Sequence, residues 1–269
     1  MITDEEMEML LYDILEIYGY DFNDYAKASF KRRLNRLITL DRFPSFAEFR
    51  FRLKDDKEYF NRFIEQITVN VTEMFRDPDF YQTLRKEVLP ILSTYPFIRI
   101  WHAGCSTGEE VFSMAIILKE ANLLHKSILY ATDINAKVVT QASTGVFNMM
   151  HMKQYTENYN LSGGIHDFSQ YYTAGNNKVI FDQSFKNHMV FSTHNLVAES
   201  SFNEFQLIVC RNVLIYFEKD LQAKVFNLFD ESLERLGFLA LGNKESIRLS
   251  PANAKFKQVG TEKIWRKMI

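Results

Sequence analysis

The apolar positions of this chain follow two rhythms, and the change between them divides the chain into two parts. Up to about residue 90, apolar residues recur mainly at the three- and four-residue spacing of amphipathic helices. From about residue 97, short apolar runs alternate with longer helical stretches, which is typical of a mainly parallel sheet with helices on both faces. We therefore predict an α/β, Rossmann-like domain over residues 91–269, preceded by a helical N-terminal domain and linker over residues 1–90.

Within the second part, short apolar runs predict buried strands and longer amphipathic stretches predict helices. The predicted strands are 97–104, 127–134, 205–212 and 238–243. The predicted helices are 109–121, which is apolar nearly all round, and 220–236. Gly237 is expected to end the second helix, since glycine is favoured just after a helix C-terminus.

Residues 145–190 interrupt the α/β rhythm. They contain many tyrosines, the pair Gly163–Gly164 and the sequence Gly175–Asn176–Asn177, and they show no long helical period. Glycine and asparagine in such clusters favour tight turns between short strands. We predict a small antiparallel β-subdomain inserted in the larger domain.

The stretch from residue 25 to residue 40 is the clearest helix of the first part. Its apolar face is predicted to carry Phe30, Leu34, Leu37 and Ile38. The opposite face is predicted to carry Arg32, Arg33 and Arg36. A helix face of this kind is either simply solvated or a docking surface for an acidic partner, and composition alone leaves both interpretations open.

Composition and charge narrow the functional classes. The chain has 269 residues, 46% of them apolar, and a net charge of −2. Such a balance gives no general attraction to nucleic acid or anionic membranes, so any electrostatic docking must come from a local patch, and no nucleic-acid partner is expected. There is no signal peptide, no run of about 18 apolar residues and no cysteine framework, so we expect a cytoplasmic protein without membrane insertion. The six histidines lack ligand spacing, and no metal site is expected.

The turn after the first predicted strand has the form of a ligand-binding loop. It reads HAGCSTGEE over residues 102–110, and Gly104 and Gly108 bracket its polar stretch. It matches neither the GxGxxG dinucleotide fingerprint nor the GxxxxGK[ST] phosphate loop. Asp133 ends the second predicted strand, where a carboxylate can accept hydrogen bonds from ribose hydroxyls. By themselves, the loop and the acid indicate an adenosine-like ligand only weakly.

Six segments, in order along nearly the whole chain, give a more specific indication. They are NVTEMFRDPDFY (70–81), RIWHAGCSTGEEVFSMAI (99–116), ATDIN (131–135), FSTHNL (191–196), FQLIVCRNVLIYF (205–217) and LGNKES (241–246). In these segments the chain resembles the chemotaxis receptor glutamate methyltransferases, the CheR family. The resemblance implies a class I S-adenosylmethionine-dependent methyltransferase fold, with S-adenosylmethionine as cofactor and S-adenosylhomocysteine as product. LGNKES departs from the commoner family pattern, so Lys244 and Glu245 receive no role.

The resemblance also implies which residues bind the cofactor. They are Asn70, Thr72, Arg76, Gly104, Glu110, Asp133, Asn195, Leu196, Arg211 and Asn212. The segment 70–76 would reach over the cofactor, and Asp133 would hold its ribose. Asn195 and Leu196 would flank its adenine.

At the methionine end of the cofactor, the resemblance places Arg211 and Asn212, and it places Tyr216 near the transferred methyl group. Arg76 and Tyr216 are the expected catalytic residues. A glutamate carboxylate is already ionised at neutral pH, since its free pKa is about 4.3, so the reaction needs positioning and exclusion of water rather than a general base. Arg76 can orient a carboxylate of the substrate or of the cofactor, and Tyr216 can donate one hydrogen bond without adding charge.

From the residues alone, ordinary structural roles stay open for several of these side chains. Thr72 could cap a helix, and Arg76 could form a surface ion pair. Tyr216 lies in an apolar run and could be a core tyrosine. Cys105 and Cys210 have no histidine–asparagine arrangement beside them, so we expect buried thiols without a catalytic role.

The resemblance implies a protein partner, a methyl-accepting chemotaxis receptor whose methylation sites lie on long acidic helices. The basic helix with Arg32, Arg33 and Arg36 fits a docking role, so charge reversal there, or added salt, should weaken methylation. In some members the small β-subdomain binds a receptor peptide by strand addition, and the sequence leaves this open. We expect the protein to act as a monomer.

Other functions fit less well. A non-catalytic signalling module would keep the fold without needing the full set of site residues. A nicotinamide oxidoreductase would need the glycine spacing that the loop lacks. A nucleic-acid methyltransferase would need a basic cleft or a base-stacking platform. A small-molecule carboxyl methyltransferase stays possible, but it would not need the basic helix.

Overall fold

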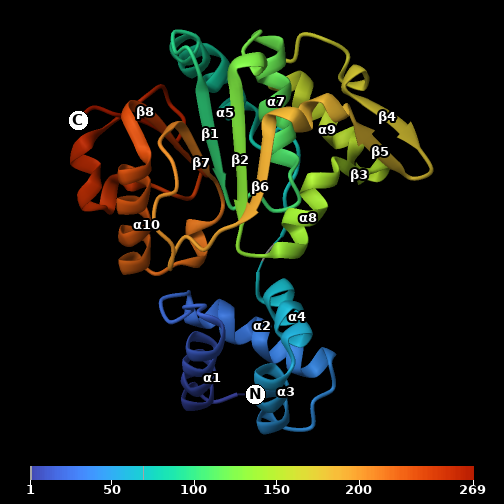
Figure 1. Ribbon diagram of the computed structural model, residues 1–269, viewed down its shortest axis with the longest axis vertical. Helices are drawn as coiled ribbons and strands as arrows, with labels where there is room; N and C mark the ends of the chain where they lie inside the picture. The colour runs from blue at the N-terminus through green and yellow to red at the C-terminus, as the bar shows by residue number, and fades with distance from the viewer. Residues whose placement is uncertain (1, 69) are drawn as a thin grey trace.

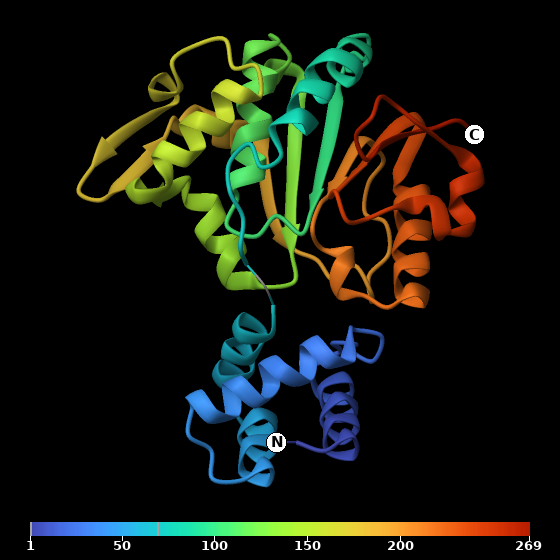
Figure 2. The same cartoon turned by 180° about the vertical axis from the view of Figure 1, so that it is seen from behind.

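The computed structural model describes residues 2–68 and 70–269, which form a helical domain and a larger sheet domain at opposite ends of the molecule (Figures 1 and 2). The helical domain contains α1 (Asp4–Tyr18), α2 (Lys27–Leu40), α3 (Phe46–Asp55) and α4 (Lys57–Ile67). Each helix turns an apolar face inward. The buried side chains at the centre of the domain include Leu10, Leu34, Phe49 and Phe63.

The basic stretch of the sequence forms α2, as predicted. Phe30, Leu34 and Leu37 are buried, and Ile38 packs against the same core. Burial of this apolar face holds α2 in the domain although no side chain caps its N-terminus. In the described part of the chain, no helix is long and apolar enough to cross a membrane.

The main sheet has the strand order β6-β2-β1-β7-β8-β10-β9. Its strands are β1 (Ile98–Ala103), β2 (Ser127–Asp133), β6 (Met189–Thr193), β7 (Phe205–Cys210), β8 (Leu233–Leu241), β9 (Phe256–Gln258) and β10 (Ile264–Lys267). The pairs from β6 to β8 are parallel, whereas β10 runs antiparallel to β8 and β9. The arrows of β1, β2 and β6 point toward the helical domain, so the edge of the sheet where ligands bind in such folds faces that domain (Figure 1).

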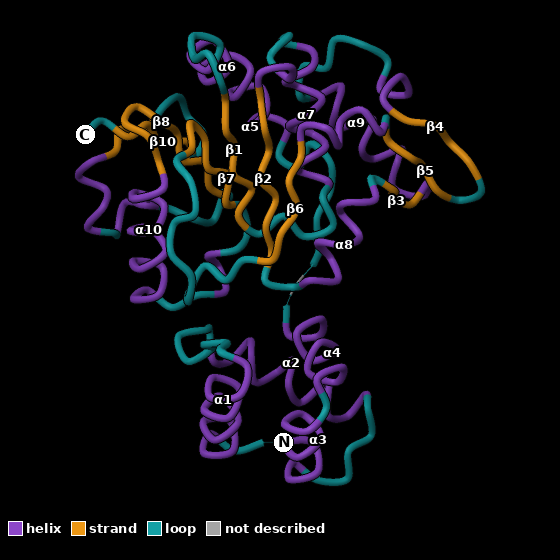
Figure 3. The backbone as a smooth tube through the Cα atoms, in the orientation of Figure 1, coloured by secondary structure: helices purple, strands orange, loops and turns teal. Residues whose placement is uncertain are grey.

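Helices cover both faces of the sheet, as the sequence pattern predicts (Figure 3). They include α5 (Pro78–Thr83), α6 (Leu89–Leu92), α7 (Glu109–Glu120), α8 (Ala136–Thr144) and α10 (Lys219–Ser232). Alternate residues of β7 belong to different cores: Leu207 and Val209 pack with α7, and Ile208 and Cys210 pack with α10. All four side chains are fully buried, which explains the uninterrupted apolar run in the sequence.

One predicted helix boundary is wrong. α10 ends at Ser232 rather than Leu236, and β8 begins directly at Leu233. Leu233 pairs with Phe205 of β7, and Leu236 has a positive φ of 68° at the irregular part of the strand. Gly237 is therefore a strand residue and not a helix stop; a Cβ there would lie 2.9 Å from a backbone carbonyl oxygen. Strand pairing overrides the helical spacing of these leucines.

The predicted insertion contains a small antiparallel sheet beside the main sheet (Figure 1). Its strands are β3 (Val146–Asn148), β5 (Lys178–Phe181) and β4 (Tyr172–Gly175). The prediction missed α9 (Met152–Leu161) in the same region. Met152, Tyr155 and Tyr159 form its buried face, and tyrosines in place of aliphatic residues concealed the helical period. The hairpin of β4 and β5 ends in an exposed turn.

The segment that follows the helical domain packs into the sheet domain. Met74, Phe75 and the residues of α5 and α6 lie in the same buried cluster as α7. The predicted helical domain and linker extend to residue 90. We propose that the helical domain itself ends with α4, because burial associates the later helices with the sheet.

Candidate active site

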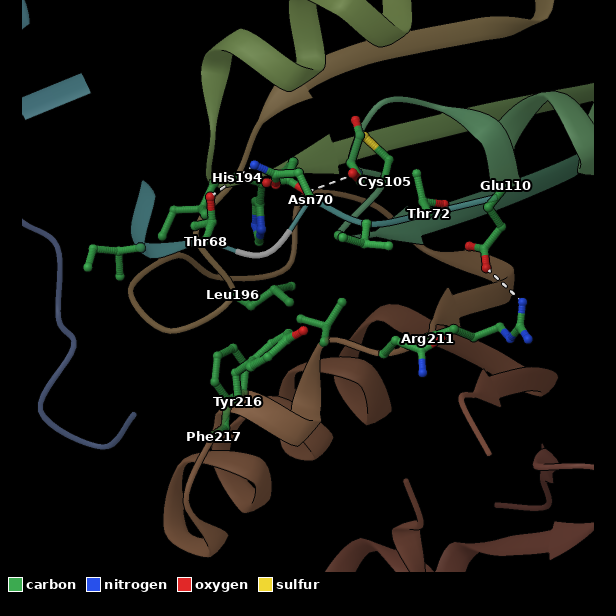
Figure 4. Close-up of a pocket in the computed structure, with 18 of the residues that line it drawn as sticks. Thr68, Asn70, Thr72, Cys105, Glu110, His194, Leu196, Arg211, Tyr216 and Phe217 are labelled. Atoms are coloured by element: carbon green, nitrogen blue, oxygen red, sulfur yellow. Dashed lines mark hydrogen bonds and ion pairs between the residues drawn. The ribbon is translucent and has the colours of Figure 1, made fainter. Parts of the chain in front are cut away.

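A cavity lies where the carboxyl ends of β1, β2 and β7 meet the helical domain. It has a volume of about 1010 Å³, its open mouth included. It is lined by the predicted site residues Asn70, Thr72, Arg76, Gly104, Glu110, Asp133, Asn195, Leu196, Arg211, Asn212 and Tyr216. Figure 4 shows that labelled side chains from Thr68 to Phe217, which lie far apart in the sequence, surround one space. The fold thus brings together residues that are up to 146 positions apart, from Asn70 to Tyr216.

The loop between β1 and α7 forms one wall, and its backbone requires glycine. Gly104 has a φ of 87°, and a Cβ there would lie 2.4 Å from Cγ2 of Val213. Gly108 has a φ of 97°, and a Cβ there would lie 2.9 Å from the Cβ of Ala142. Larger residues are excluded at both positions, so the bare backbone at Gly104 lines the cavity.

Asp133, at the end of β2, is held by the same loop. Its Oδ2 accepts a hydrogen bond from the N–H of Ser106 at 2.9 Å, and its Oδ1 accepts one from the N–H of Asn135 at 3.0 Å. Burial raises the pKa of this carboxyl, and the backbone hydrogen bonds oppose the rise. The carboxylate lines the cavity, where it can accept further hydrogen bonds from a pair of ribose hydroxyls.

Glu110 and Arg211 form a buried ion pair at the cavity wall (Figure 4). Nη1 of Arg211 donates to Oε2 of Glu110 at 3.2 Å, and Nδ1 of His102 lies 3.0 Å from Oε1. Burial tends to raise the pKa of Glu110, but the hydrogen bond with His102 and the charge of Arg211 hold it below its usual value. Nη2 of Arg211 also donates to the carbonyl oxygen of Arg76 at 3.0 Å and to Asp77 at 2.6 Å. Arg211 therefore ties the segment of Arg76 and Asp77 to the start of α7.

Glu245, for which the sequence predicts no role, organises the loop after β7. Its carboxylate accepts hydrogen bonds from the backbone N–H groups of Gly242 (2.7 Å), Leu214 (2.7 Å), Asn212 (3.0 Å) and Ile215 (3.3 Å). The side chain is buried, whereas the neighbouring Lys244 is exposed. The signal in the sequence was an acid shortly after an apolar strand. The sequence LGNKES does not indicate which of its two adjacent charged residues, Lys244 or Glu245, is buried.

Asn70 and Thr72 lie on the segment between α4 and α5, across the cavity from Tyr216 (Figure 4). The cap of α5 is Asp77, so the interpretation of Thr72 as a helix cap is wrong. The guanidinium of Arg76 makes one long contact, 3.5 Å, to the carbonyl oxygen of Val71. No carboxylate in residues 2–68 or 70–269 forms an ion pair with it, so its charge is available to a ligand.

Asn195 and Leu196 lie in the turn after β6. Oδ1 of Asn195 accepts a hydrogen bond from the N–H of Val197 at 3.0 Å, which fixes the turn. Leu196, Val197 and Ile134 give this part of the cavity an apolar lining. A flat aromatic ring such as adenine can pack there without leaving a buried charge unpaired.

Tyr216 ends the short helix η6 (Leu214–Tyr216), and its ring reaches into the cavity (Figure 4). It is half-buried, so it is not the core tyrosine that its apolar neighbours suggested. Burial raises the pKa of its hydroxyl, and the charges of Arg33 and Arg76 oppose the rise. The hydroxyl is therefore protonated at neutral pH and can donate a hydrogen bond to a substrate.

The three arginines of the predicted basic face of α2 differ in their exposure to solvent. Arg32 and Arg36 are exposed, as predicted. Arg33 is half-buried and lines the cavity, with its guanidinium carbon 4.9 Å from the centre of the Tyr216 ring. The prediction that Arg33 faces outward is therefore wrong, because a helical period cannot show that a second domain covers part of the helix, whereas its docking role stays a prediction.

The chemistry of the cavity fits S-adenosylmethionine. Asp133 supplies the ribose acceptor, and Gly104 supplies bare backbone. Oγ of Ser106 is buried without a hydrogen-bond partner among the described residues, so a ligand can satisfy it. Cys105 also lines the cavity, but burial raises the pKa of its thiol well above the usual value, which argues against a nucleophile.

Two family profiles match this chain, one over the helical domain and one over the sheet domain. The profile described as "CheR methyltransferase, SAM binding domain" matches residues 70–264, and "CheR methyltransferase, all-alpha domain" matches residues 5–68. This chain belongs to the CheR methyltransferase family. As a CheR methyltransferase, it has the class I methyltransferase fold and uses S-adenosylmethionine as its cofactor.

Two relatives align with almost the whole length of this CheR methyltransferase. "Putative methyltransferase Cher3" of Pseudomonas putida is 45% identical over 266 residues, which are 98% of this chain and 97% of its own. "Chemotaxis protein methyltransferase" of Listeria innocua is 32% identical over 258 residues, which are 94% and 95% of the two chains. The structure of the N-methyltransferase NodS from Bradyrhizobium japonicum with S-adenosylhomocysteine overlaps 63% of this chain and 62% of its own, at 15% identity and a TM-score of 0.35.

Proposed function

We propose that this CheR methyltransferase methylates glutamate side chains of a methyl-accepting chemotaxis receptor, or of a receptor-like protein, in the cytoplasm. Two relatives named chemotaxis protein methyltransferases align with more than 90% of this chain, and those names support a receptor substrate. The observation that carries the proposal is that Arg76 and Tyr216 both line the cavity. Arg76 has no carboxylate partner among the described residues, so an incoming carboxylate can complete its contacts.

The reaction requires the protein to position the substrate carboxylate rather than to transfer a proton. Methyl transfer forms a bond from the carboxylate oxygen to the methyl carbon as the sulfonium S–CH₃ bond breaks and its electron pair stays on sulfur. The substrate carboxylate is already ionised at neutral pH, so no base is needed. Arg76 orients it, the Tyr216 hydroxyl donates one hydrogen bond to it, and the cavity walls exclude water from a weak nucleophile.

Methyl ester formation tests this function directly. With radiolabelled S-adenosylmethionine and the cytoplasmic fragment of a methyl-accepting receptor, the protein is expected to form esters that base releases as methanol. Tyr216→Phe is expected to lower kcat about tenfold, because one hydrogen bond to a charged group is lost. Tyr12→Phe removes the hydroxyl of an exposed tyrosine on α1 and is expected to change nothing. Binding of the receptor fragment and S-adenosylhomocysteine without any ester would favour the non-catalytic signalling module instead.

Arg32 and Arg36 are exposed basic residues of α2 that can meet an acidic receptor helix. The double variant Arg32→Glu, Arg36→Glu is expected to lower kcat/KM for the receptor fragment about tenfold and to leave affinity for S-adenosylhomocysteine unchanged. Raising the salt concentration from about 0.05 M to 0.5 M is expected to weaken the wild type more than the variant, since salt screens exposed charges.

The control for this docking surface is Arg52→Glu, which changes an exposed arginine on α3. It alters the net charge in the same direction but belongs to another helix. An equal loss for each reversed charge in the control and in the Arg32 and Arg36 double variant would mean that net charge, and not a docking helix, governs the encounter with the receptor.

A further inference from the structure

A histidine interrupts the apolar face that the inner strand β1 turns toward α7. Ile98 and Ile100 of this face pack into the buried cluster that contains α7, and His102 is the next residue on the same face. The side chain of His102 is fully buried. Because a buried polar ring costs free energy unless its nitrogens are hydrogen-bonded, the partners of this histidine are informative.

One ring nitrogen of His102 contacts Glu110. Nδ1 lies 3.0 Å from Oε1 of the carboxylate. Burial tends to raise the pKa of Glu110, but the contact with His102 and the charge of Arg211 hold it below its usual value, so the carboxylate is ionised at neutral pH. An ionised carboxylate can only accept, so Nδ1 of His102 carries the hydrogen and donates it. Nε2 is buried and has no hydrogen-bond partner in residues 2–68 and 70–269.

The other carboxylate oxygen of Glu110 has a donor of its own. Nη1 of Arg211 donates to Oε2 at 3.2 Å (Figure 4). Two donors from different strands and loops therefore fix the orientation of the carboxylate. Glu110 belongs to the described cavity lining and His102 does not. His102 can thus influence a ligand in the cavity through Glu110.

The ion pairs around Arg211 leave a negative charge at the cavity wall. Its guanidinium pairs with two carboxylates, those of Glu110 and Asp77, and Glu110 is the one that lines the cavity. A cationic group of a ligand would balance the remaining negative charge. S-adenosylmethionine carries two cationic groups, its sulfonium and the α-ammonium of its methionine part. The ammonium has N–H donors that a carboxylate can accept from, whereas the sulfonium has none.

We propose that His102 is a positioning residue, which holds the carboxylate of Glu110 so that it accepts hydrogen bonds from the α-ammonium of S-adenosylmethionine. This role goes beyond the proposed function, because it is the same whichever carboxylate receives the methyl group. Asp133, at the ribose end, is held by Ser106 and Asn135 instead. Removal of His102 should therefore weaken ligands that have the ammonium and spare ligands that lack it.

Three ligands with the same nucleoside test this role by calorimetric titration of the full-length protein. S-adenosylmethionine has both cationic groups, S-adenosylhomocysteine has the ammonium alone, and methylthioadenosine has neither. His102→Leu fills much of the space of the ring without a donor. It is expected to weaken binding of the first two ligands about tenfold or more, since a hydrogen bond to a charged group is lost. Affinity for methylthioadenosine should stay within about twofold of the wild type.

A matched variant restores the donor. Asparagine has nearly the shape of leucine, and its amide nitrogen can donate as Nδ1 does. His102→Asn is therefore expected to recover most of the affinity that His102→Leu loses. His102→Ala, a second variant without a donor, should show the same selective loss. The control Ser127→Ala removes another buried hydrogen bond, from Oγ to the carbonyl oxygen of Leu123 at 2.8 Å, and should leave all three affinities unchanged.

A loss limited to the two ammonium-bearing ligands, and reversed in His102→Asn, supports the inference. Equal losses for all three ligands would indicate general damage to the cavity. A loss for S-adenosylmethionine alone would place the sulfonium, and not the ammonium, at Glu110. Unchanged affinities in His102→Leu and His102→Ala, or no recovery in His102→Asn, would show that the donor at Nδ1 does not matter. Each of these three results overturns the inference, and none bears on the glutamate substrate, which ester formation tests separately.

Discussion

Asp133→Ala is expected to weaken binding of S-adenosylhomocysteine about 100-fold or more. The carboxylate is buried, is held by the N–H groups of Ser106 and Asn135, and lines the cavity at the end of β2. Each hydrogen bond from a ribose hydroxyl to a charged acceptor contributes about 1.5–3 kcal/mol, and two of them can account for such a loss. Calorimetric titration of both proteins with S-adenosylhomocysteine measures the effect.

A control for Asp133 lies nearby, at the start of α7. Glu109 is also a buried acid, but its carboxylate contacts Thr107 and is not part of the cavity lining. Glu109→Gln is expected to keep the affinity within about threefold, as expected for a change that removes no ligand contact. Equal losses in the two variants would indicate general damage to the loop, and unchanged affinity in Asp133→Ala would refute the ribose-binding role.

Glu245→Gln is expected to lower the free energy of unfolding by about 3 kcal/mol and to reduce methyl transfer strongly. The amide group replaces one carboxylate oxygen and faces backbone N–H groups that it cannot accept from. Each buried donor left without a partner costs about 1–3 kcal/mol. Asn212, Leu214 and Ile215 would lose their anchor, and Tyr216 follows them directly in the chain. Chemical denaturation and the transfer assay measure the two effects.

A variant of the neighbouring Lys244 distinguishes anchoring of the loop after β7 by Glu245 from a general effect of removing a charge. Lys244 is exposed, and Lys244→Ala is expected to change stability by less than about 0.5 kcal/mol. If Glu245→Gln kept wild-type stability and activity, its hydrogen bonds with the loop would not be what holds Tyr216 in place.

The sequence predicted the sheet well where burial is complete on both faces. The runs 97–104 and 205–212 form β1 and β7, with no end shifted by more than two residues, because parallel strands covered by helices are apolar throughout. The predicted ligand residues were also brought together, since loops at the carboxyl ends of such strands meet at one edge. Their individual roles toward cofactor and substrate stay predictions.

Three of the failures share one physical cause: the decisive contact comes from a distant element. Arg33 looked like a solvent-facing residue because a helical period does not show that Tyr216, 183 positions later, lies against it. Glu245 looked unremarkable because its partners are backbone groups of another loop. The end of α10 was misplaced because pairing of Leu233 with β7 outweighs the helical spacing of the sequence.

The exposed hairpin of β4 and β5 makes the protein suitable for site-specific fluorescent labelling. A Cβ at Gly175 would have no neighbouring atom within 4 Å, so Gly175→Cys places a reactive thiol in open solvent. The native Cys105 and Cys210 are only 2% and 0% exposed, and burial raises the pKa of both thiols. A maleimide dye would therefore attach at position 175 alone. Because the hairpin contributes nothing to the described cavity lining, the dye can report encounters with a receptor array while the chemistry stays untouched.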